Sequence, residues 1–261
     1  MSAEDRLSAL PDGLLHAIMS FLLAPQAVQM SLLSRRWRHL WRSAPLIKID
    51  SHDFGISGIS SRDTMDERWA RFEDFATNLL LFHDNISSLG AFRLRSRLHN
   101  MCHVDRWVRR GIEYCPSVLQ IQILGFDHGF KLPVDMLIEN SDKFPIFDNM
   151  RTLDLYGCFC NEYELNDKLE ALRSFIKNAP CLEKLILQYC MYYSFSDSEW
   201  EPERKNITLH RHGNIFQCQK LKLIEVIYDY DHDHQLIELL WSLGRSLPDA
   251  SIKLSKIELF P

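Results

Sequence analysis

The chain has 261 residues, of which 46% are hydrophobic and 25% are charged, and its formal net charge is −5. This composition is typical of a folded globular protein and excludes a disordered chain. Residues 1–50 hold six of the 30 lysines and arginines and four of the 35 acidic residues, which leaves 24 basic against 31 acidic residues for the remainder. An acidic body of this kind argues against nucleic acid as a partner.

The sequence also argues against a membrane or secreted protein. No run reaches the roughly 18 apolar residues that a membrane-spanning helix needs. The apolar segment 14–24 follows Glu4 and Asp5, whereas a signal peptide begins with positive charge. The seven cysteines include no Cys-x-x-Cys pair, and their odd number fits reduced thiols. We therefore expect a cytoplasmic and/or nuclear protein.

Residues 5–45 predict three short helices. Leu10-Pro11-Asp12 is typical of a helix start, and Pro25 opens a second helix. Apolar residues recur at helical spacing through the segment, namely Leu14, Leu15, Ile18, Phe21, Leu22, Val28, Leu32, Leu33, Trp37, Leu40 and Trp41. About forty residues cannot bury this much apolar surface among themselves. Either the rest of the chain or another protein must cover part of it.

The order of Leu10-Pro11-Asp12, Ser34-Arg35-Arg36-Trp37 and Leu40-Trp41 resembles the F-box of plant proteins with leucine-rich repeats. The form is that of the FBD-type family without its C-terminal FBD domain. Ala24 and Gln26 depart from it, since a polar cap and an acidic residue are usual there. The resemblance implies that residues 1–45 dock onto the Skp-type adaptor of a cullin-RING ubiquitin ligase. It implies docking by Leu10, Pro11, Leu14, Ile18, Leu22, Val28, Leu33, Trp37, Leu40 and Trp41.

After Pro45 the pattern changes from helix to strand, beginning with residues 46–50. A short figure, apolar-x-x-apolar-x-apolar, then starts again at residues 89, 118, 150, 182, 221 and 254. Helical periodicity fills the intervals at 66–82, 104–114, 169–179 and 235–247. Alternation of strand and helix predicts parallel strands with crossover helices. We therefore expect an α/β leucine-rich-repeat solenoid, or horseshoe, over residues 46–261. A compact α/β sheet with irregular strand order is the alternative.

The segment Ala179–Leu187 resembles the repeat unit of plant F-box proteins, which supports this interpretation. Many relatives of this type carry a further C-terminal domain, whereas this chain stops at Pro261, after its last predicted strand. We expect an uncapped edge there, which is consistent with truncation, a short isoform or a partner at that end.

No catalytic motif stands out, and the sequence predicts no cofactor. Asp229–His234 is rich in potential metal ligands, but an acidic solvated loop explains it more simply. His99, Cys102 and His103 lack a fourth ligand at zinc spacing, so we expect them to belong to a loop and a helix start. Cys158 is expected at a buried repeat position with Cys160 as its neighbour.

The strands also predict a second binding surface. Side chains alternate along a strand, so the residues beside each buried pair point to the concave face. The predicted target contacts are Arg93, Arg95, Gln122, Asp154, Tyr156, Gln188 and Glu225, and the last strand is expected to add Lys256, Glu258 and Phe260. The aromatic insert 191–206 is a candidate lid. The competing interpretation is that these are ordinary solvated strand positions.

The hypothesis is a non-catalytic, substrate-recognition subunit of an SCF-type ubiquitin ligase. It would bind a Skp-type adaptor, through it a cullin, and an unknown target protein, but no nucleic acid and no membrane. Two alternatives stay open. The N-terminal helices could simply cap the repeats of an interaction scaffold outside any ligase, or the horseshoe could bind a small molecule as a sensor.

Overall fold

The structure is a computed structural model, and it describes residues 7, 9–56, 62–84, 89–97, 101–124, 146–156, 172, 174–188, 218–228 and 250–256. The chain forms two compact units, Met1–Gly125 and Phe126–Pro261. Several predictions lie outside the described residues: the helix at 235–247, the insert 191–206, the segment 229–234, and His99, Cys158, Cys160, Glu258 and Phe260.

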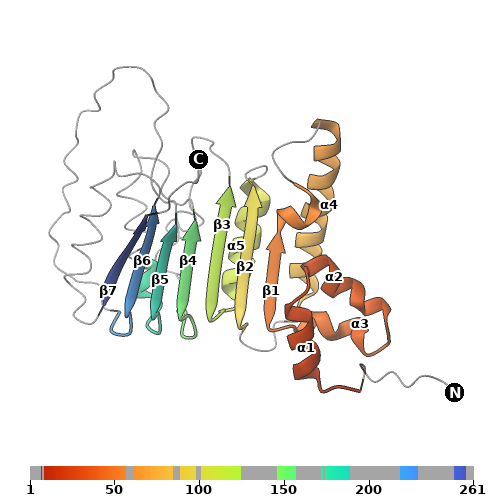
Figure 1. Ribbon diagram of the computed structural model, residues 1–261, viewed down its shortest axis with the longest axis horizontal. Coiled ribbons are helices and arrows are strands. Elements are labelled where there is room, and N and C mark those ends of the chain that lie inside the picture. The colour runs from red at the N-terminus through yellow and green to blue at the C-terminus, as the bar shows by residue number, and fades with distance from the viewer. Residues whose placement is uncertain are drawn as a thin grey trace. The chain divides into compact units, whose positions relative to one another are not determined.

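The first unit opens with a helical module, which we define as residues 9–43. It contains α1 (Asp12–Ser20), α2 (Ala24–Gln29) and α3 (Trp37–Leu40), with two 3-10 helices, η1 (Met30–Leu32) and η2 (Trp41–Ser43) (Figure 1). Asp12 lies in the first turn of α1, where its charge suits the helix N-terminus. The Gln26 side-chain oxygen accepts a hydrogen bond from the Leu23 N–H at 3.2 Å, so this residue closes the start of α2 itself.

The core of the helical module is small and apolar. Leu15 and Met19 lie four residues apart on one face of α1 and pack with Trp37 and Leu40 of α3. Around these four, partly buried side chains complete the cluster: Leu10, Ile18, Ala27, Met30 and Trp41. The module therefore has an interior of its own.

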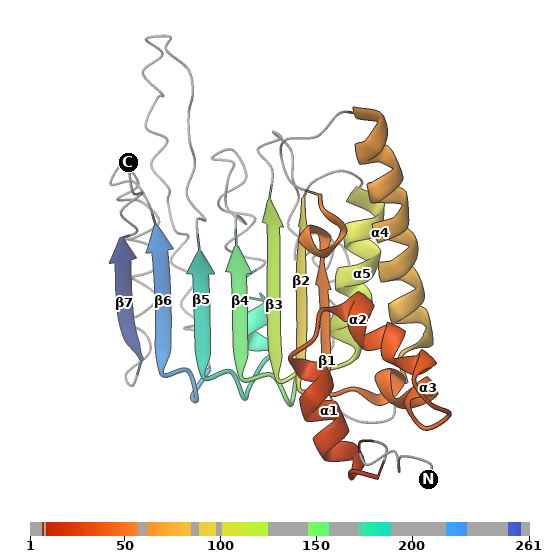
Figure 2. The same ribbon diagram turned by 45° about the vertical axis from the view of Figure 1, so that its right-hand side comes forward.

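Three parallel strands follow in chain order, β1 (Leu46–Asp50), β2 (Ala91–Arg97) and β3 (Val118–Leu124). The crossover helices α4 (Arg62–Phe82) and α5 (Met101–Glu113) lie on one side of them, as Figures 1 and 2 show. Phe72 of α4 and Trp107 of α5 meet edge to face, with ring centroids 5.3 Å apart. The α5 backbone also approaches the strands closely, because Gly111 lies directly over the buried ring of Phe92.

The second unit repeats the pattern with four parallel strands, β4 (Thr152–Tyr156), β5 (Lys184–Gln188), β6 (Leu223–Tyr228) and β7 (Ser251–Lys256). Residues 174–177 are helical, and Phe175 stacks on Phe147 at 4.6 Å between ring centroids. The predicted fold class is confirmed: an N-terminal helical module precedes parallel strands that alternate with helices.

The predicted position of the last strand was wrong. The sequence pattern aligned Leu254 with Leu221, which put Ile257 beside Ile224. In the structure Ile252 pairs with Ile224 and Leu254 pairs with Val226, so the strand begins five residues earlier in register than expected. Residues 251–256 alternate polar and apolar side chains as regularly as the predicted strand, which begins at Leu254. The pattern alone therefore does not decide between the two segments. Lys253 and Ser255 therefore lie on the face of the sheet that also carries Glu225 and Ile227.

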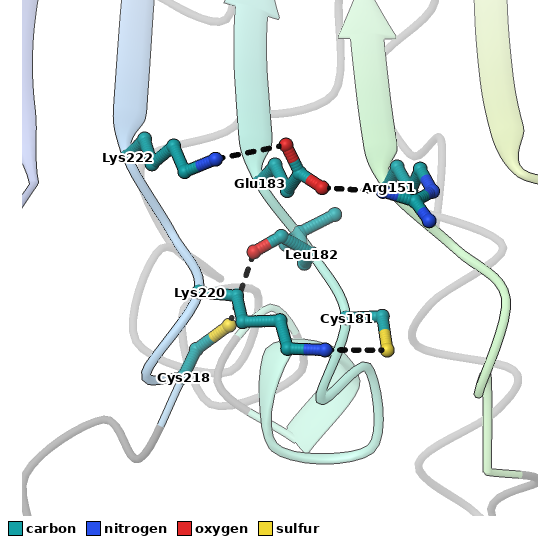
Figure 3. Close-up of polar contacts among 7 residues, drawn as sticks. All are labelled: Arg151, Cys181, Leu182, Glu183, Cys218, Lys220 and Lys222. Atoms are coloured by element: carbon teal, nitrogen blue, oxygen red, sulfur yellow. Dashed lines mark hydrogen bonds and ion pairs between the residues drawn. The ribbon is translucent and has the colours of Figure 1, made fainter.

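Polar contacts link neighbouring strand entries of the second unit (Figure 3). The Glu183 carboxylate, just before β5, accepts from Arg151 before β4 at 2.6 Å and from Lys222 before β6 at 3.3 Å. These two bonds, that of Lys222 first, lower the pKa of Glu183. In the next layer the Cys218 thiol donates to the Leu182 carbonyl at 3.4 Å. Ion pairs at the surface and a hydrogen bond from a buried thiol therefore connect neighbouring repeats.

We expect Gly111→Ala to destabilise the first unit, because the new methyl group would overlap the Phe92 ring, which is fully buried. Overpacking of this kind costs about 1–3 kcal/mol. Gly13→Ala in α1 is the matched control, since nothing lies within 4 Å of its new methyl group and alanine favours helix. Urea unfolding followed by circular dichroism measures both. Equal stability of the two variants would contradict the close packing of α5 on β2.

Candidate functional site

The helical module is attached to the strands by the segment that follows η2. Arg42 donates from Nε to the Phe82 carbonyl at 2.9 Å and forms an ion pair with Asp84 at 3.0 Å. The Asp84 N–H donates back to the Arg42 carbonyl at 2.7 Å. His83 donates from Nε2 to the Ala44 carbonyl at 2.9 Å, and burial lowers the pKa of its imidazole. The start of the first strand and the end of α4 therefore hold the module in one orientation.

A cavity of about 40 Å³ lies where α1 and α2 meet β1 and α4. Leu22, Val28 and Trp41 line it, together with His16 and His83. Small-molecule sites usually enclose at least about 300 Å³, so this space suits an ordered water and not a ligand of drug size. The three apolar side chains are turned toward the strands and mainly complete the junction.

The module also exposes apolar side chains in unusual density. Six of the ten large hydrophobic residues that are exposed in the described part of the chain belong to residues 7–33: Leu7, Leu14, Phe21, Leu23, Leu32 and Leu33. We call these six the exposed apolar set. Phe21 is 89% exposed and Leu32 is 85% exposed, so the described residues cover neither side chain. Leu14 and Phe21 are seven residues apart and point to the same side of α1, away from the buried Leu15 and Met19. Such concentrations mark interaction surfaces.

The ten residues implied in adaptor docking fall into three groups. Trp37 and Leu40 are 1% and 6% exposed, so they form the core of the module and offer a partner no surface in this arrangement. A second group is half-buried against that core or the strands: Leu10, Ile18, Leu22, Val28 and Trp41. The exposed group is Pro11, Leu14 and Leu33.

Helical periodicity did not distinguish the two apolar sides of α1, which is why the sequence prediction mixed core and surface positions. Phe21 and Leu32 were apolar members of the predicted helices but were not selected as docking residues. One feature of the sequence could have indicated that they are exposed. Phe21 and Leu32 lie at the ends of short helices, away from the side that packs into the core. A basic rim accompanies them, because Arg35 and Arg38 are exposed, and Arg36 holds Asp12 of α1 at 2.7 Å.

The predicted target residues lie on the strands, where Asp154 is buried and the others are half-buried or exposed. In the first unit Arg93 and Arg95 of β2 are exposed, and Gln122 of β3 is in register with Arg95. In the second unit the Gln188 amide donates to Asp154 at 2.9 Å, and Tyr156 is half-buried.

Glu225 is the charged centre of the face of the second unit. It pairs with Lys184 at 3.1 Å and with Lys253 at 2.7 Å, and these hydrogen bonds, that of Lys253 first, lower the pKa of its carboxyl. Its charge is therefore balanced from both neighbouring strands.

Comparison with known proteins agrees with this architecture. A model of the F-box domain family matches residues 7–49, which include the helical module and most of β1. Three relatives illustrate the likeness. A meiotic F-box protein, MOF, from Oryza sativa subsp. japonica is 39% identical over 46% of this chain and 26% of its own length. A putative F-box/LRR-repeat protein from Arabidopsis thaliana is 27% identical over 72% of this chain and 38% of its own. An F-box/FBD/LRR-repeat protein from the same plant is 25% identical over 83% and 51%.

The chain contains an F-box domain and is similar to members of the plant F-box/LRR family. It spans about half or less of the length of these relatives. Members of the family are typically non-catalytic substrate adaptors of SCF ligases, and F-box domains in general bind a Skp-type adaptor. No solved structure matches the chain significantly.

The F-box protein shows no other site chemistry in the residues that can be described. There, no group of three or more His, Cys, Asp or Glu side chains is placed to hold a metal ion. Within the same residues, no helix has both the length and the apolar character to cross a membrane.

We expect Glu225→Gln to lower the melting temperature at neutral pH and to match the wild type in acid. The folded state lowers the pKa of this carboxyl below its ordinary value of 4.5, so its ion pairs stabilise the fold above that pH. The contribution is lost as the pH falls through the folded pKa and the carboxylate is protonated. Thermal melts of both proteins between pH 7 and pH 3.5 measure the difference. A gap that stays constant over this range would contradict the role of the two lysines.

Proposed function

We propose that this F-box protein is the substrate receptor of an SCF-type ubiquitin ligase and that the exposed apolar set docks its Skp-type adaptor. The observation that carries the proposal is the exposure of Phe21 and Leu32 in a module whose own core is already filled. Covering one such side chain contributes about 1.5–3 kcal/mol. Arg35 and Arg38 at the rim fit the usual anatomy of an interface, with an apolar centre and a charged border.

A role as a cap alone accounts for fewer observations. Capping the first strand requires the core of the module, the cavity lining and the bonds of Arg42 and His83, all of which face the chain. It does not require exposed leucines on the other side. The module can cap the strand and bind a partner at once, because the two tasks use different side chains.

The strand faces would hold the target protein, and the adaptor would connect the chain to a cullin. No bond is made or broken by the F-box protein on this proposal. It raises the local concentration of target lysines near the ubiquitin-loaded enzyme, which is catalysis by proximity. A location in the cytoplasm, the nucleus or both is part of this proposal. The cavity at the junction of the module is too small for a ligand of drug size.

The double variant Phe21→Ala/Leu32→Ala should bind a purified Skp-type adaptor at least about tenfold more weakly, because two anchors of about 1.5–3 kcal/mol each are lost. Isothermal titration calorimetry with the full chain gives the affinity. The matched control is Leu81→Ala/Phe82→Ala, which removes exposed side chains of the same types from α4. Unchanged affinity in the first variant, or equal loss in the control, would remove the exposed apolar set from the docking surface.

Trp37→Ala tests a different property. Since Trp37 is buried among Leu15, Met19 and Leu40, its removal should unfold the module, at about 3–5 kcal/mol, and abolish binding indirectly. The melting profile separates the two mechanisms. Phe21→Ala/Leu32→Ala should melt like the wild type, whereas Trp37→Ala should melt at a lower temperature.

A further inference from the structure

The middle strand of the first unit carries three arginines in a row. Arg93, Arg95 and Arg97 occupy alternate positions of β2, and all three side chains are exposed. Between them Phe92, Leu94 and Ser96 are buried toward the helices. The arginines therefore share the side of the strand opposite to α4 and α5, about 6.6 Å apart along the chain direction. We call this row the arginine ladder.

Beside Arg93 the neighbouring strands add a cation and no anion. Lys48 of β1 is in register with Arg93, so the two cations project from directly adjacent positions. Neighbouring strands are about 4.8 Å apart. Like charges in such positions destabilise a sheet. On the other side the register partners are Gln120, Gln122 and Leu124, none of which is charged.

Two acidic residues act on Arg95, Asp50 through an ion pair and Asp53 through its electrostatic attraction. Asp50 of β1 lies 3.8 Å from Arg95, and its other carboxylate oxygen accepts from the His52 N–H. Arg93 and Arg97 have neither an ion pair nor a hydrogen bond among the residues that the structure describes. The lysines of the second unit differ in this respect, because Glu225 pairs with two of them. In a chain of net charge −5 the ladder is a local positive surface.

We propose that the arginine ladder binds an extended acidic segment of the target protein, with carboxylates at alternate positions. This inference rests on the proposed function and names the chemistry of its partner. An extended chain that runs along β2 repeats its side chains at the same spacing as the arginines, so Glu-x-Glu-x-Glu matches the three guanidinium groups. Arginine binds carboxylate through two parallel hydrogen bonds, which gives specificity as well as attraction.

Carboxylates fit this surface better than phosphates do. Asp50 stays beside the central arginine and repels any anion that approaches it. A phosphate group carries about −1.5 to −2 charges at neutral pH and would be repelled more strongly than a carboxylate. The central contact is therefore suited to a single negative charge.

Fluorescence anisotropy tests the proposal with the full chain and a labelled peptide of alternating Glu and Ser. The wild type should bind this peptide more tightly than a peptide of the same composition with its Glu residues in one block. The double variant Arg93→Glu/Arg97→Glu should bind at least about tenfold more weakly. Raising the salt concentration should weaken binding of the wild type, because these charges are exposed.

Arg71→Glu/Arg106→Glu is the matched control. It makes the same change of net charge at exposed arginines of α4 and α5, and its affinity should stay within about twofold of the wild type. Equal loss in the control would show attraction by net charge alone and would overturn the proposal. Equal binding of the blocked peptide, or tighter binding of a peptide with phosphoserine in place of Glu, would overturn it as well.

Adaptor binding by the same variants separates this inference from the proposed function. Arg93→Glu/Arg97→Glu should bind the Skp-type adaptor like the wild type, because the ladder shares no residue with the exposed apolar set. A wild-type chain that binds the acidic peptide but no adaptor would overturn the proposed function and leave the ladder assignment standing. A chain that binds the adaptor but does not prefer the alternating peptide would overturn the ladder assignment alone.

Discussion

The carbonyl group of Pro45 is the contact on which the first unit depends. It accepts two hydrogen bonds from the entry of β2, from Gly90 N–H at 2.9 Å and from Ala91 N–H at 3.1 Å. The same device returns in the second unit, where the carbonyls of Arg151 and Glu183 each accept two N–H groups from the next strand. In each case one carbonyl, just before a strand, accepts from the start of the next strand and so sets the register of the parallel pair. The segment before Pro45 is the helical module, so the two bonds to the Pro45 carbonyl also fix the end of the module to β2.

Close approach at that point restricts the sequence. A side chain at Gly90 would place its first carbon 3.0 Å from the Pro45 oxygen, which leaves little space for anything but hydrogen. Because the module, β1 and β2 are joined within one unit, the exposed apolar set and the arginine ladder are held by the same core. An adaptor on one surface and a target on the other would then be connected through packed side chains and backbone hydrogen bonds, without a linker.

Much of the fold could be predicted because two different periods occur in the sequence. The helical spacing of Trp69, Phe72 and Ala76 and the alternation in β2 leave little ambiguity, and the structure has α4 and β2 there. The last strand was misplaced because residues 251–256 and the segment after them alternate equally well. Its register is decided by pairing with β6, which is a tertiary contact that no local pattern contains.

The candidate site was harder to predict for a similar reason. In a module of this size nearly every helix has apolar residues on two sides, and periodicity ranks Leu14 and Leu15 alike. Leu15 is buried by Trp37, which is distant in the sequence, whereas Leu14 is left outside. Of the charged strand residues, Arg93 and Arg95 are exposed and Glu225 is half-buried, whereas Asp154 is buried. The lack of an anion beside Arg93 depends on Lys48 being its partner in register, and the pattern of one strand does not contain that information.

The exposed apolar set also has a consequence for the unbound chain. Side chains such as Phe21 and Leu32 in contact with water favour self-association, so on the proposed function a chain without its adaptor would tend to aggregate. A partner that covers them adds stability that grows with the logarithm of its free concentration. Solubility and lifetime would then follow the supply of that partner, and the steady-state abundance of the chain would be limited by it.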